Sequence, residues 1–124
     1  MTTIPNLVAN AVNDFHNREA VVDGDLRWTF EEYADQINGA TKAFISKGIQ
    51  PGDRIAVWAP NTARWPVAAL GAHCAGAVLV PINTRFKGET FDIILMVNSF
   101  HNIAKPLDLI DLRIFSDNFF DFIS

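Results

Sequence analysis

Apolar side chains near the start of the chain follow the period of an α-helix. They fall on one helical face and comprise Leu7, Val8, Ala11, Val12 and Phe15. Pro5 stands where the first turn of a helix tolerates a residue that lacks an N–H group. The pattern therefore predicts a first helix that starts near Pro5 and ends near Phe15.

Two short apolar runs follow and predict a β-hairpin. Residues 20–22 and 26–28 flank the tripeptide Asp23-Gly24-Asp25. A short connection that contains glycine is typical of two antiparallel strands joined by a tight turn. We expect the two runs to pair with each other.

A second helix is predicted directly after the hairpin. Thr29 and Glu32 have the spacing of a capping box, in which each side chain satisfies a backbone N–H group of the other residue. The apolar positions that continue along one helical face are Tyr33, Ile37, Ala40 and Phe44. Gly48 should end this helix because glycine adopts the left-handed conformation at low cost.

The turn-forming and capping residues that follow predict a strand and then a third helix. Pro51-Gly52-Asp53 reads as a turn, and residues 54–59 combine apolar and β-branched side chains. Pro60-Asn61-Thr62 should stop the strand and cap a helix over residues 63–75. Pro66 lies in the tolerant first turn of that helix.

A short, continuously apolar segment completes the pattern. Gly76 should end the third helix, and residues 77–82 (AVLVPI) then predict a strand that is covered on both faces. A strand, a helix and a strand within about thirty residues form a βαβ unit, whose crossover makes the two strands parallel. The expected fold class is α/β, with a β-hairpin and a parallel βαβ unit.

Composition is that of one globular domain and excludes several partners. The chain has 124 residues, of which 49% are hydrophobic and 19% charged. Its net charge of −4 argues against a nucleic-acid backbone or an anionic membrane surface as a partner. A single cysteine, Cys74, excludes an internal disulfide and is typical of the reducing cytoplasm, where we expect the protein to reside.

The charge balance and the amino-acid composition change after Gly88, which the values for the whole chain do not show. Residues 1–88 hold eight basic and eight acidic side chains, whereas residues 89–124 hold two basic and six acidic ones. The second segment also has six of the ten Phe residues and no glycine. We therefore predict a domain segment over 1–88 and a divergent or unrelated tail over 89–124, with a natural end, a shifted reading frame and a truncated gene as open explanations.

No membrane or export segment is expected. Residues 1–13 lack the basic start and long apolar core of a secretory signal. Residues 65–84 carry no charge and are long enough to span a bilayer as a helix. Pro66, Gly71, Gly76 and Pro81 interrupt them, so a buried helix followed by a buried strand is the favoured interpretation over a membrane span.

Four blocks of the sequence resemble the N-terminal region of the adenylate-forming enzymes, and in particular the acyl-CoA synthetases. Residues 28–33 (WTFEEY) are similar to the family motif T-Y/F-x-E, and residues 48–57 (GIQPGDRIAV) to G-V/I-x-x-G-D-R-V-A. Residues 57–61 (VWAPN) and 73–88 (HCAGAVLVPINTRFKG) complete the series in the family's order. Any one block is weak evidence, whereas four in order are specific.

The resemblance implies an N-terminal fragment of an ATP-dependent acyl-CoA synthetase. The complete family enzymes use ATP, Mg²⁺ and coenzyme A to convert a small-molecule carboxylate first to an acyl-adenylate and then to a thioester. Their phosphate-binding Ser/Thr/Gly-rich loop, with its Pro-Lys-Gly, and their late catalytic Lys have no counterpart in these 124 residues. We therefore assign no catalytic or cofactor-binding residue, expect no cofactor for this chain alone, and expect it to be inactive.

The run from Asn83 (NTRFK) is typical of synthetases for fatty-acyl or steroid-side-chain substrates, which indicates a place in fatty acid metabolism. The alternative is a non-catalytic α/β module that binds a ligand or another chain. If the parent sheet is interrupted after residue 88, apolar faces are left exposed, and we expect self-association.

Several residues are candidates for chemical roles, but structural roles are favoured for them. Gly71 and Gly76 have phosphate-loop spacing but lie between helix and strand and lack the following Lys. His73 and Cys74 are neighbours, which point about 100° apart on a helix and so do not form a nucleophile pair. His16 and His101 lie far from His73 in sequence, and no metal site is expected.

The remaining candidates also have simpler interpretations. Glu31 and Glu32 suit the first turn of a helix. Trp28, Trp58 and Trp65 are candidates to stack on an adenine or acyl group, but core packing is favoured. Arg85 and Lys87 are candidates to bind a phosphate, but a position in a solvated loop is the simpler interpretation. The four serines that lack a nucleophile-elbow context are Ser46, Ser99, Ser116 and Ser124.

Overall fold

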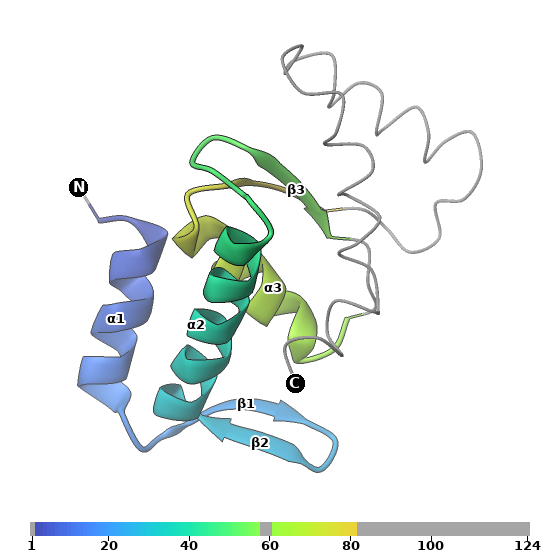
Figure 1. The fold of residues 1–124 in the computed structure, drawn as a ribbon. Helices are drawn as coiled ribbons and strands as arrows, with labels where there is room; N and C mark the ends of the chain where they lie inside the picture. The colour runs from blue at the N-terminus through green and yellow to red at the C-terminus, as the bar shows by residue number, and fades with distance from the viewer. Residues whose placement is uncertain (1, 58–60, 82–124) are drawn as a thin grey trace.

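The computed structural model describes residues 2–57 and 61–81, and the fold is given for these alone (Figure 1). Within them it contains three helices, an antiparallel pair of strands and a parallel pair. The elements in chain order are α1 (Ile4–Phe15), β1 (Glu19–Asp23), β2 (Leu26–Thr29), α2 (Phe30–Ser46), β3 (Arg54–Val57), α3 (Arg64–Cys74) and β4 (Val78–Pro81). The predicted α/β class, hairpin and parallel βαβ unit are confirmed.

Helix α1 is held at both ends. Thr3 caps its N-terminus by accepting a hydrogen bond from the Asn6 N–H at 3.4 Å, and Pro5 lies in the first turn. At the other end the Glu31 N–H donates to the His16 carbonyl at 3.2 Å, and the Phe30 N–H donates to the Arg18 carbonyl at 3.0 Å. These two bonds join the end of α1 to the start of α2.

The predicted capping box of α2 is present in full. The Thr29 hydroxyl accepts from the Glu32 N–H at 3.2 Å, and the Glu32 carboxylate accepts from the Thr29 N–H at 2.9 Å. The helix ends at Ser46, and Gly48 has a φ of 90°, as its predicted left-handed conformation requires. The hairpin of β1 and β2 lies beside the N-terminal end of α2 (Figure 1).

Strands β3 and β4 are parallel neighbours, with Arg54 opposite Val78 and Val57 opposite Pro81. The turn before β3 is closed by its own aspartate, because the Asp53 carboxylate accepts from the Gln50 N–H at 2.8 Å. The Gly52 N–H donates to the Gly76 carbonyl at 2.9 Å, which ties this turn to the end of α3. The G-D-R block thus sets the register in which the two strands enter the sheet.

Helices α2 and α3 pack closely because α3 presents a glycine to α2. A Cβ atom placed on Gly71 would lie 2.7 Å from the Cβ of Ala40, a distance that two carbon atoms do not tolerate. The Thr41 hydroxyl donates to the Ile37 carbonyl at 2.8 Å and lies 3.3 Å from the Gly71 carbonyl. Glycine at this position therefore sets the distance between the two helices.

The core lies where α2 and α3 meet β3. Its largest fully buried side chains are Phe44, Ile37, Ile55 and Val57. Most of its other members are alanines from α2, α3 and their flanking turns. Small side chains on facing helices allow close backbone approach, so this core is compact.

Two local predictions were wrong. Asn61 and Thr62 do not cap α3; Ala63 is the N-cap residue and no side chain within the segment caps it. Strand β4 is not covered on both faces, since Val78 is 50% exposed and Pro81 is also exposed. Among the described helices α3 packs most against β4.

Other predictions fall partly or wholly outside the described residues. They concern the end of the first predicted parallel strand at residues 58–59, the end of the second at Ile82, and the whole segment 89–124. The division after Gly88 therefore stays a prediction. Among the described residues no helix is both long and apolar enough to cross a membrane.

Candidate functional site

The carboxyl ends of β3 and β4 form the edge of the sheet at which a ligand-binding site is expected. In parallel α/β sheets, ligands bind outside the carboxyl ends of the strands, where the following helices begin. Val57 and Pro81 lie opposite each other at this edge, and α3 begins a few residues after β3. A free helix N-terminus at such an edge attracts anions such as phosphate, because its first N–H groups lack partners within the helix.

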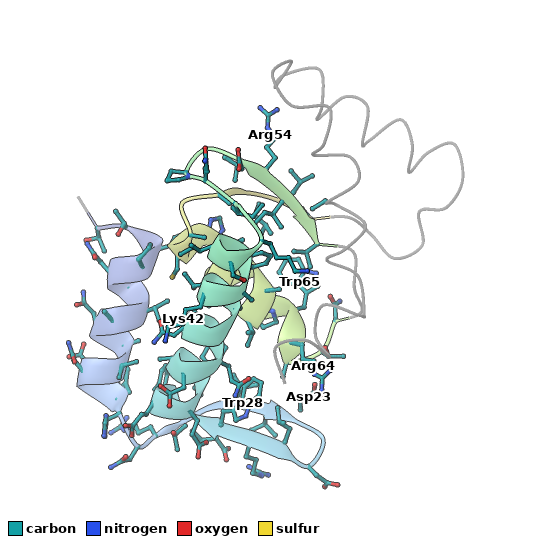
Figure 2. All side chains as sticks on the ribbon, in the orientation of Figure 1. Asp23, Trp28, Lys42, Arg54, Arg64 and Trp65 are labelled. Carbon is teal, nitrogen blue, oxygen red and sulfur yellow. The ribbon has the colours of Figure 1, made fainter. Side chains whose placement is uncertain are left out.

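The N-terminus of α3 is already occupied by a carboxylate of this chain. Asp23, the last residue of β1, accepts a hydrogen bond from the Ala63 N–H at 2.8 Å. Figure 2 shows Asp23 at the end of the hairpin, close to Arg64 at the start of α3. An aspartate forty residues away in sequence therefore satisfies one backbone N–H at this helix end, where Asn61 or Thr62 was expected to supply a cap.

The remaining groups of this helix end leave little to hold a phosphate. The Trp65 N–H donates to the Thr62 carbonyl at 3.1 Å, and Pro66 has no N–H group. The described part of this edge therefore does not by itself form a phosphate cradle, and the adjoining residues 58–60 and those after 81 lie outside the described segments. Nor do the described residues bring together three or more side chains able to hold a metal ion such as Mg²⁺.

Two of the three tryptophans pack against the core. Trp28 and Trp65 are partly buried beside the core cluster, and Trp28 stacks on Tyr33 with ring centroids 6.2 Å apart and planes 15° apart. The core interpretation is confirmed for these two residues. Trp58 lies outside the described residues.

Cys74 is half-buried at the end of α3, where its surroundings favour the neutral thiol. Burial raises the pKa of its thiol, and a hydrogen bond with Thr41 opposes that shift only in part. No hydrogen bond joins the His73 ring to the Cys74 sulfur within the described segments. A thiol with a raised pKa is less often present as the reactive thiolate.

Gly71 and Gly76 have the structural roles predicted for them. Gly71 is buried inside α3 against Ala40, and Gly76 follows the helix with a φ of 79°. Neither lies in a loop that opens a helix, which a phosphate loop requires. The helix-packing interpretation is confirmed.

The paired glutamates also have structural roles. Glu32 belongs to the capping box of α2, and Glu31 lies 3.2 Å from the exposed His16 ring. The Ser46 hydroxyl donates to the Ala43 carbonyl at 2.8 Å and has no histidine beside it in its described surroundings. The other candidate residues lie outside the described segments; they are Arg85, Lys87, Ser99, His101, Ser116 and Ser124.

Sequence reasoning missed the role of Asp23. Its only local signal is that of a turn residue in a hairpin, and nothing in the sequence connects it with a helix that begins forty residues later. A helix start with Pro66 in its first turn and an unfavourable N-cap residue is the indirect signal that a remote acceptor is needed.

Comparison with known proteins decides the family. The model of the AMP-binding enzyme family matches residues 8–99, about three quarters of the chain. The chain belongs to the AMP-binding enzyme family. The adenylate-forming resemblance of the four sequence blocks is thereby confirmed.

Curated relatives within the AMP-binding family are acyl-CoA ligases. One, from Rhodococcus jostii strain RHA1, is 48% identical over 94 residues; it is a propanoyl:CoA ligase whose acyl group carries a 7a-methyl-1,5-dioxo-octahydroindene ring system. Its Mycobacterium tuberculosis counterpart is 40% identical over 95 residues, and the medium-chain acyl-CoA ligase ACSF2 of rat is 29% identical over 94 residues. These alignments cover 75%, 76% and 74% of this chain but 18%, 19% and 15% of the relatives.

Solved structures of AMP-binding enzymes share the fold. The N-terminal domain of FACL13 from Mycobacterium tuberculosis superposes with a TM-score of 0.74 at 30% identity, over 77% of this chain and 24% of that one. The fused adenylation–PCP di-domain NpsA-ThdA from Klebsiella oxytoca gives 0.77 at 19% identity, over 80% and 19% respectively, which shows the fold alone. This chain spans about one fifth of the length of the curated relatives it matches and corresponds to an N-terminal part of them.

Proposed function

We propose that this chain is the N-terminal scaffold segment of an ATP-dependent acyl-CoA ligase. The observation that carries the proposal is the 48% identity over 94 residues to an acyl-CoA ligase of which the aligned segment makes up 18%. The compact contact between α2 and α3 and the parallel pair of β3 and β4 support a structural role. In the complete enzyme these elements would hold in place the sheet on which later segments build the reaction site.

The proposed reaction of the complete enzyme has two steps. A substrate carboxylate attacks the α-phosphate of ATP, which forms an acyl-adenylate and releases pyrophosphate; the thiol of coenzyme A then displaces AMP and leaves the thioester. Mg²⁺ would neutralise the phosphate charge when bound. The described residues of this chain contribute none of these reacting groups.

We further propose that the carboxylate carries an apolar, ring-bearing acyl group. Support comes from two relatives, 48% and 40% identical, that are both named as propanoyl:CoA ligases with an octahydroindene ring system on the acyl group. A medium-chain fatty acid is the second substrate class, supported by ACSF2 at 29% identity.

A chimaeric ligase tests the scaffold proposal. In the Rhodococcus jostii ligase, the aligned segment is replaced by the matching residues of this chain, and thioester formation from ATP, coenzyme A and that enzyme's own substrate is measured. We expect activity within about tenfold of the parent, equivalent to roughly 1.4 kcal/mol in the activation barrier. A matched chimaera carrying Gly71→Leu should lose activity because the α2–α3 contact is forced apart. A well-folded first chimaera without activity would contradict the proposal.

The 124-residue chain alone is proposed to be inactive. The sequence contains no Ser/Thr/Gly-rich loop followed by Pro-Lys-Gly, which the family resemblance associates with ATP binding. Carboxylate-dependent exchange of labelled pyrophosphate into ATP measures adenylation directly. No exchange is expected, and exchange above the level of a denatured control would overturn the fragment proposal.

Self-association and a cytoplasmic location are also proposed. Support for association comes from large apolar side chains that are at least 38% exposed; they are Ile4, Leu7, Phe15, Val22, Leu26, Ile45 and Val78. The single cysteine supports a reducing compartment. Size-exclusion chromatography with light scattering is expected to show a mass that rises with concentration. A monomer with cooperative thermal unfolding at all concentrations would contradict self-association.

A further inference from the structure

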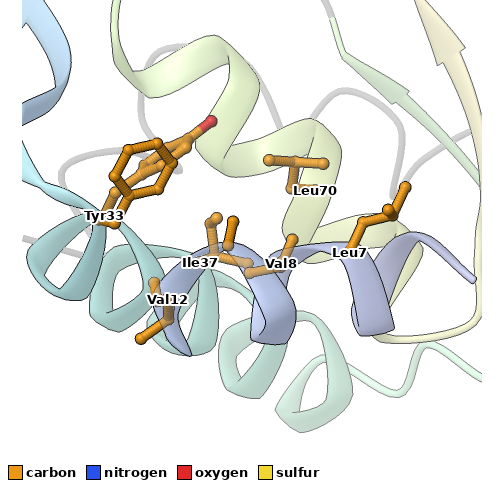
Figure 3. A pocket seen from close by; sticks show the side chains of 9 residues that line it. Leu7, Val8, Val12, Tyr33, Ile37 and Leu70 are labelled. Atoms are coloured by element: carbon orange, nitrogen blue, oxygen red, sulfur yellow. The ribbon is translucent and has the colours of Figure 1, made fainter. Parts of the chain in front are cut away.

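An apolar cavity of about 200 Å³, open to solvent on one side, lies between the three helices (Figure 3). Helix α1 lines one wall and α2 the other, while Leu70 of α3 closes the back. The lining residues are Leu7, Val8, Ala11, Val12, Phe30, Tyr33, Ala34, Ile37 and Leu70. This cavity lies apart from the carboxyl edge of β3 and β4, and neither the family nor the proposed ligase activity assigns it a role.

The cavity exists because short side chains stand on both of its walls. Ala11 on α1 and Ala34 on α2 line the space and do not fill it. The backbone bonds from Glu31 to His16 and from Phe30 to Arg18 fix the end of α1 against the start of α2.

Aromatic contacts make one end and one wall of the cavity rigid. Phe30 packs against Phe15 with ring centroids 5.3 Å apart, and Arg18 lies over the Phe15 ring at 5.8 Å. Tyr33 is held by its stack on Trp28. At the other end Leu7 is 56% exposed, which leaves a way in from solvent. The cavity is therefore bounded by packed aromatic rings at one end and open to solvent at the Leu7 end.

The side chains that line the cavity determine which class of ligand it can bind. The described lining presents carbon almost throughout, with no charged side chain, so water inside it would find few hydrogen-bond partners. An engineered apolar cavity of about 150 Å³ in another protein stays dry and binds benzene or xenon. From these observations we infer that the cavity between α1, α2 and α3 is a binding site for a small hydrocarbon group of about benzene size.

Benzene itself is the probe, added to the full 124-residue chain and followed by saturation-transfer NMR of the ligand. We expect saturable binding to the unchanged chain. Ala11→Leu, which places a larger side chain in the cavity, should weaken binding by about tenfold or more. Ala9→Leu is the matched control, because Ala9 is exposed on the same helix and does not line the cavity, and it should bind as the unchanged chain does.

A second filling variant and a second ligand complete the test. Ala34→Leu fills the cavity from α2 and should also weaken binding, which guards against an effect of Ala11→Leu on folding; circular dichroism checks that each variant is folded. Competition by hexanoate would support the alkyl chain of an amphiphile as the source of the group. Benzene binding without such competition would support a free hydrocarbon. Equal benzene binding by all variants, or no saturable binding, would overturn the inference, and neither result depends on ligase activity.

Discussion

The contact between α2 and α3 and the contact between α1 and α2 are both helix pairs, but they are built in different ways. Gly71 lets α3 approach α2 until a single added carbon would lie 2.7 Å from Ala40. Helix α1 has no buried residue and leaves a cavity of about 200 Å³ where Ala11 and Ala34 line its walls. The first pair is closely packed along its length, whereas the second is joined mainly at one end, by backbone bonds near His16 and Arg18 and by the Phe15–Phe30 contact.

The difference separates a structural core from a peripheral helix. Close-packed interfaces lose stability when volume is either added or removed. An interface with a cavity tolerates added volume and depends less on any one side chain. We therefore expect substitutions in the α2–α3–β3 core to have large effects and comparable substitutions in α1 to have small ones.

The largest effect is expected from a matched pair of phenylalanine substitutions. Phe44 is fully buried and Phe15 is 42% exposed. Phe44→Ala should lower the free energy of unfolding by about 3–5 kcal/mol, the usual cost of emptying a buried aromatic site. Phe15→Ala should cost about 1 kcal/mol, mainly through its contact with Phe30. Urea unfolding followed by circular dichroism measures both, and equal losses would remove the distinction between core and periphery.

Adding one carbon at Gly71 tests the close approach of the two helices. Gly71→Ala should destabilise the chain by about 1–2 kcal/mol, because overpacking outweighs the higher helix propensity of alanine. In an Ala40→Gly background the opposing Cβ is absent, so the same substitution should cost much less. A double-mutant cycle in urea gives the coupling. If Gly71→Ala has the same effect in both backgrounds, the proposed contact does not limit the packing.

The remote cap on α3 is expected to contribute about as much as a local one. Asp23→Ala leaves the Ala63 N–H without its acceptor and should cost about 1 kcal/mol. Asp25→Ala in the adjacent turn is the control and should change stability by less than about 0.5 kcal/mol. Thermal unfolding of the two variants side by side makes the comparison. A loss for Asp25→Ala as large as that for Asp23→Ala would argue against the cap.

The two threonine caps offer a finer comparison between α2 and α1. Thr29 belongs to a complete capping box, whereas Thr3 accepts one long bond of 3.4 Å. Thr29→Ala should cost about 1 kcal/mol and Thr3→Ala roughly half as much or less. Chemical unfolding under identical conditions measures both. A greater loss for Thr3→Ala would mean that α1 contributes more to the cooperative unit than its packing indicates.

The smallest expected effect is the change in stability with pH that follows from ionisation of the Cys74 thiol. Burial raises the pKa of its thiol, so the unfolded chain ionises at lower pH than the folded one. The corresponding stability is present below the ordinary thiol pKa and is lost as the pH rises through the folded value. Alkylation by iodoacetamide should therefore be slower in the folded chain than in urea near pH 9. A faster reaction in the folded chain would show an activated thiolate instead.

Local features of the fold were predictable because they depend on neighbours in sequence. The capping box at Thr29 and Glu32, the left-handed Gly48 and the hairpin around Gly24 all follow from residues at most a few positions apart. The parallel pairing of β3 and β4 followed from the crossover that joins them.

Features that depend on distant residues were missed. The acceptor at the start of α3 comes from Asp23, forty residues away. A helix-packing role was predicted for Gly71, but its partner Ala40 on α2 was not. The exposure of Val78 was also missed, because an apolar run predicts a buried strand without saying which elements cover it. The cavity beside α1 had no sequence signal, since Leu7, Val8 and Val12 predict a packed face whether or not that face is filled.

Amide hydrogen exchange of the 124-residue chain tests most directly whether α2, α3 and β3 form the structural core that this segment would bring to a ligase. Exchange of the most protected amides in these elements should require global unfolding, while α1 should open at a lower free energy. Denaturant should therefore accelerate exchange in the core more steeply than in α1. Protection of α1 equal to that of α2 and α3, with the same dependence on denaturant, would contradict the account.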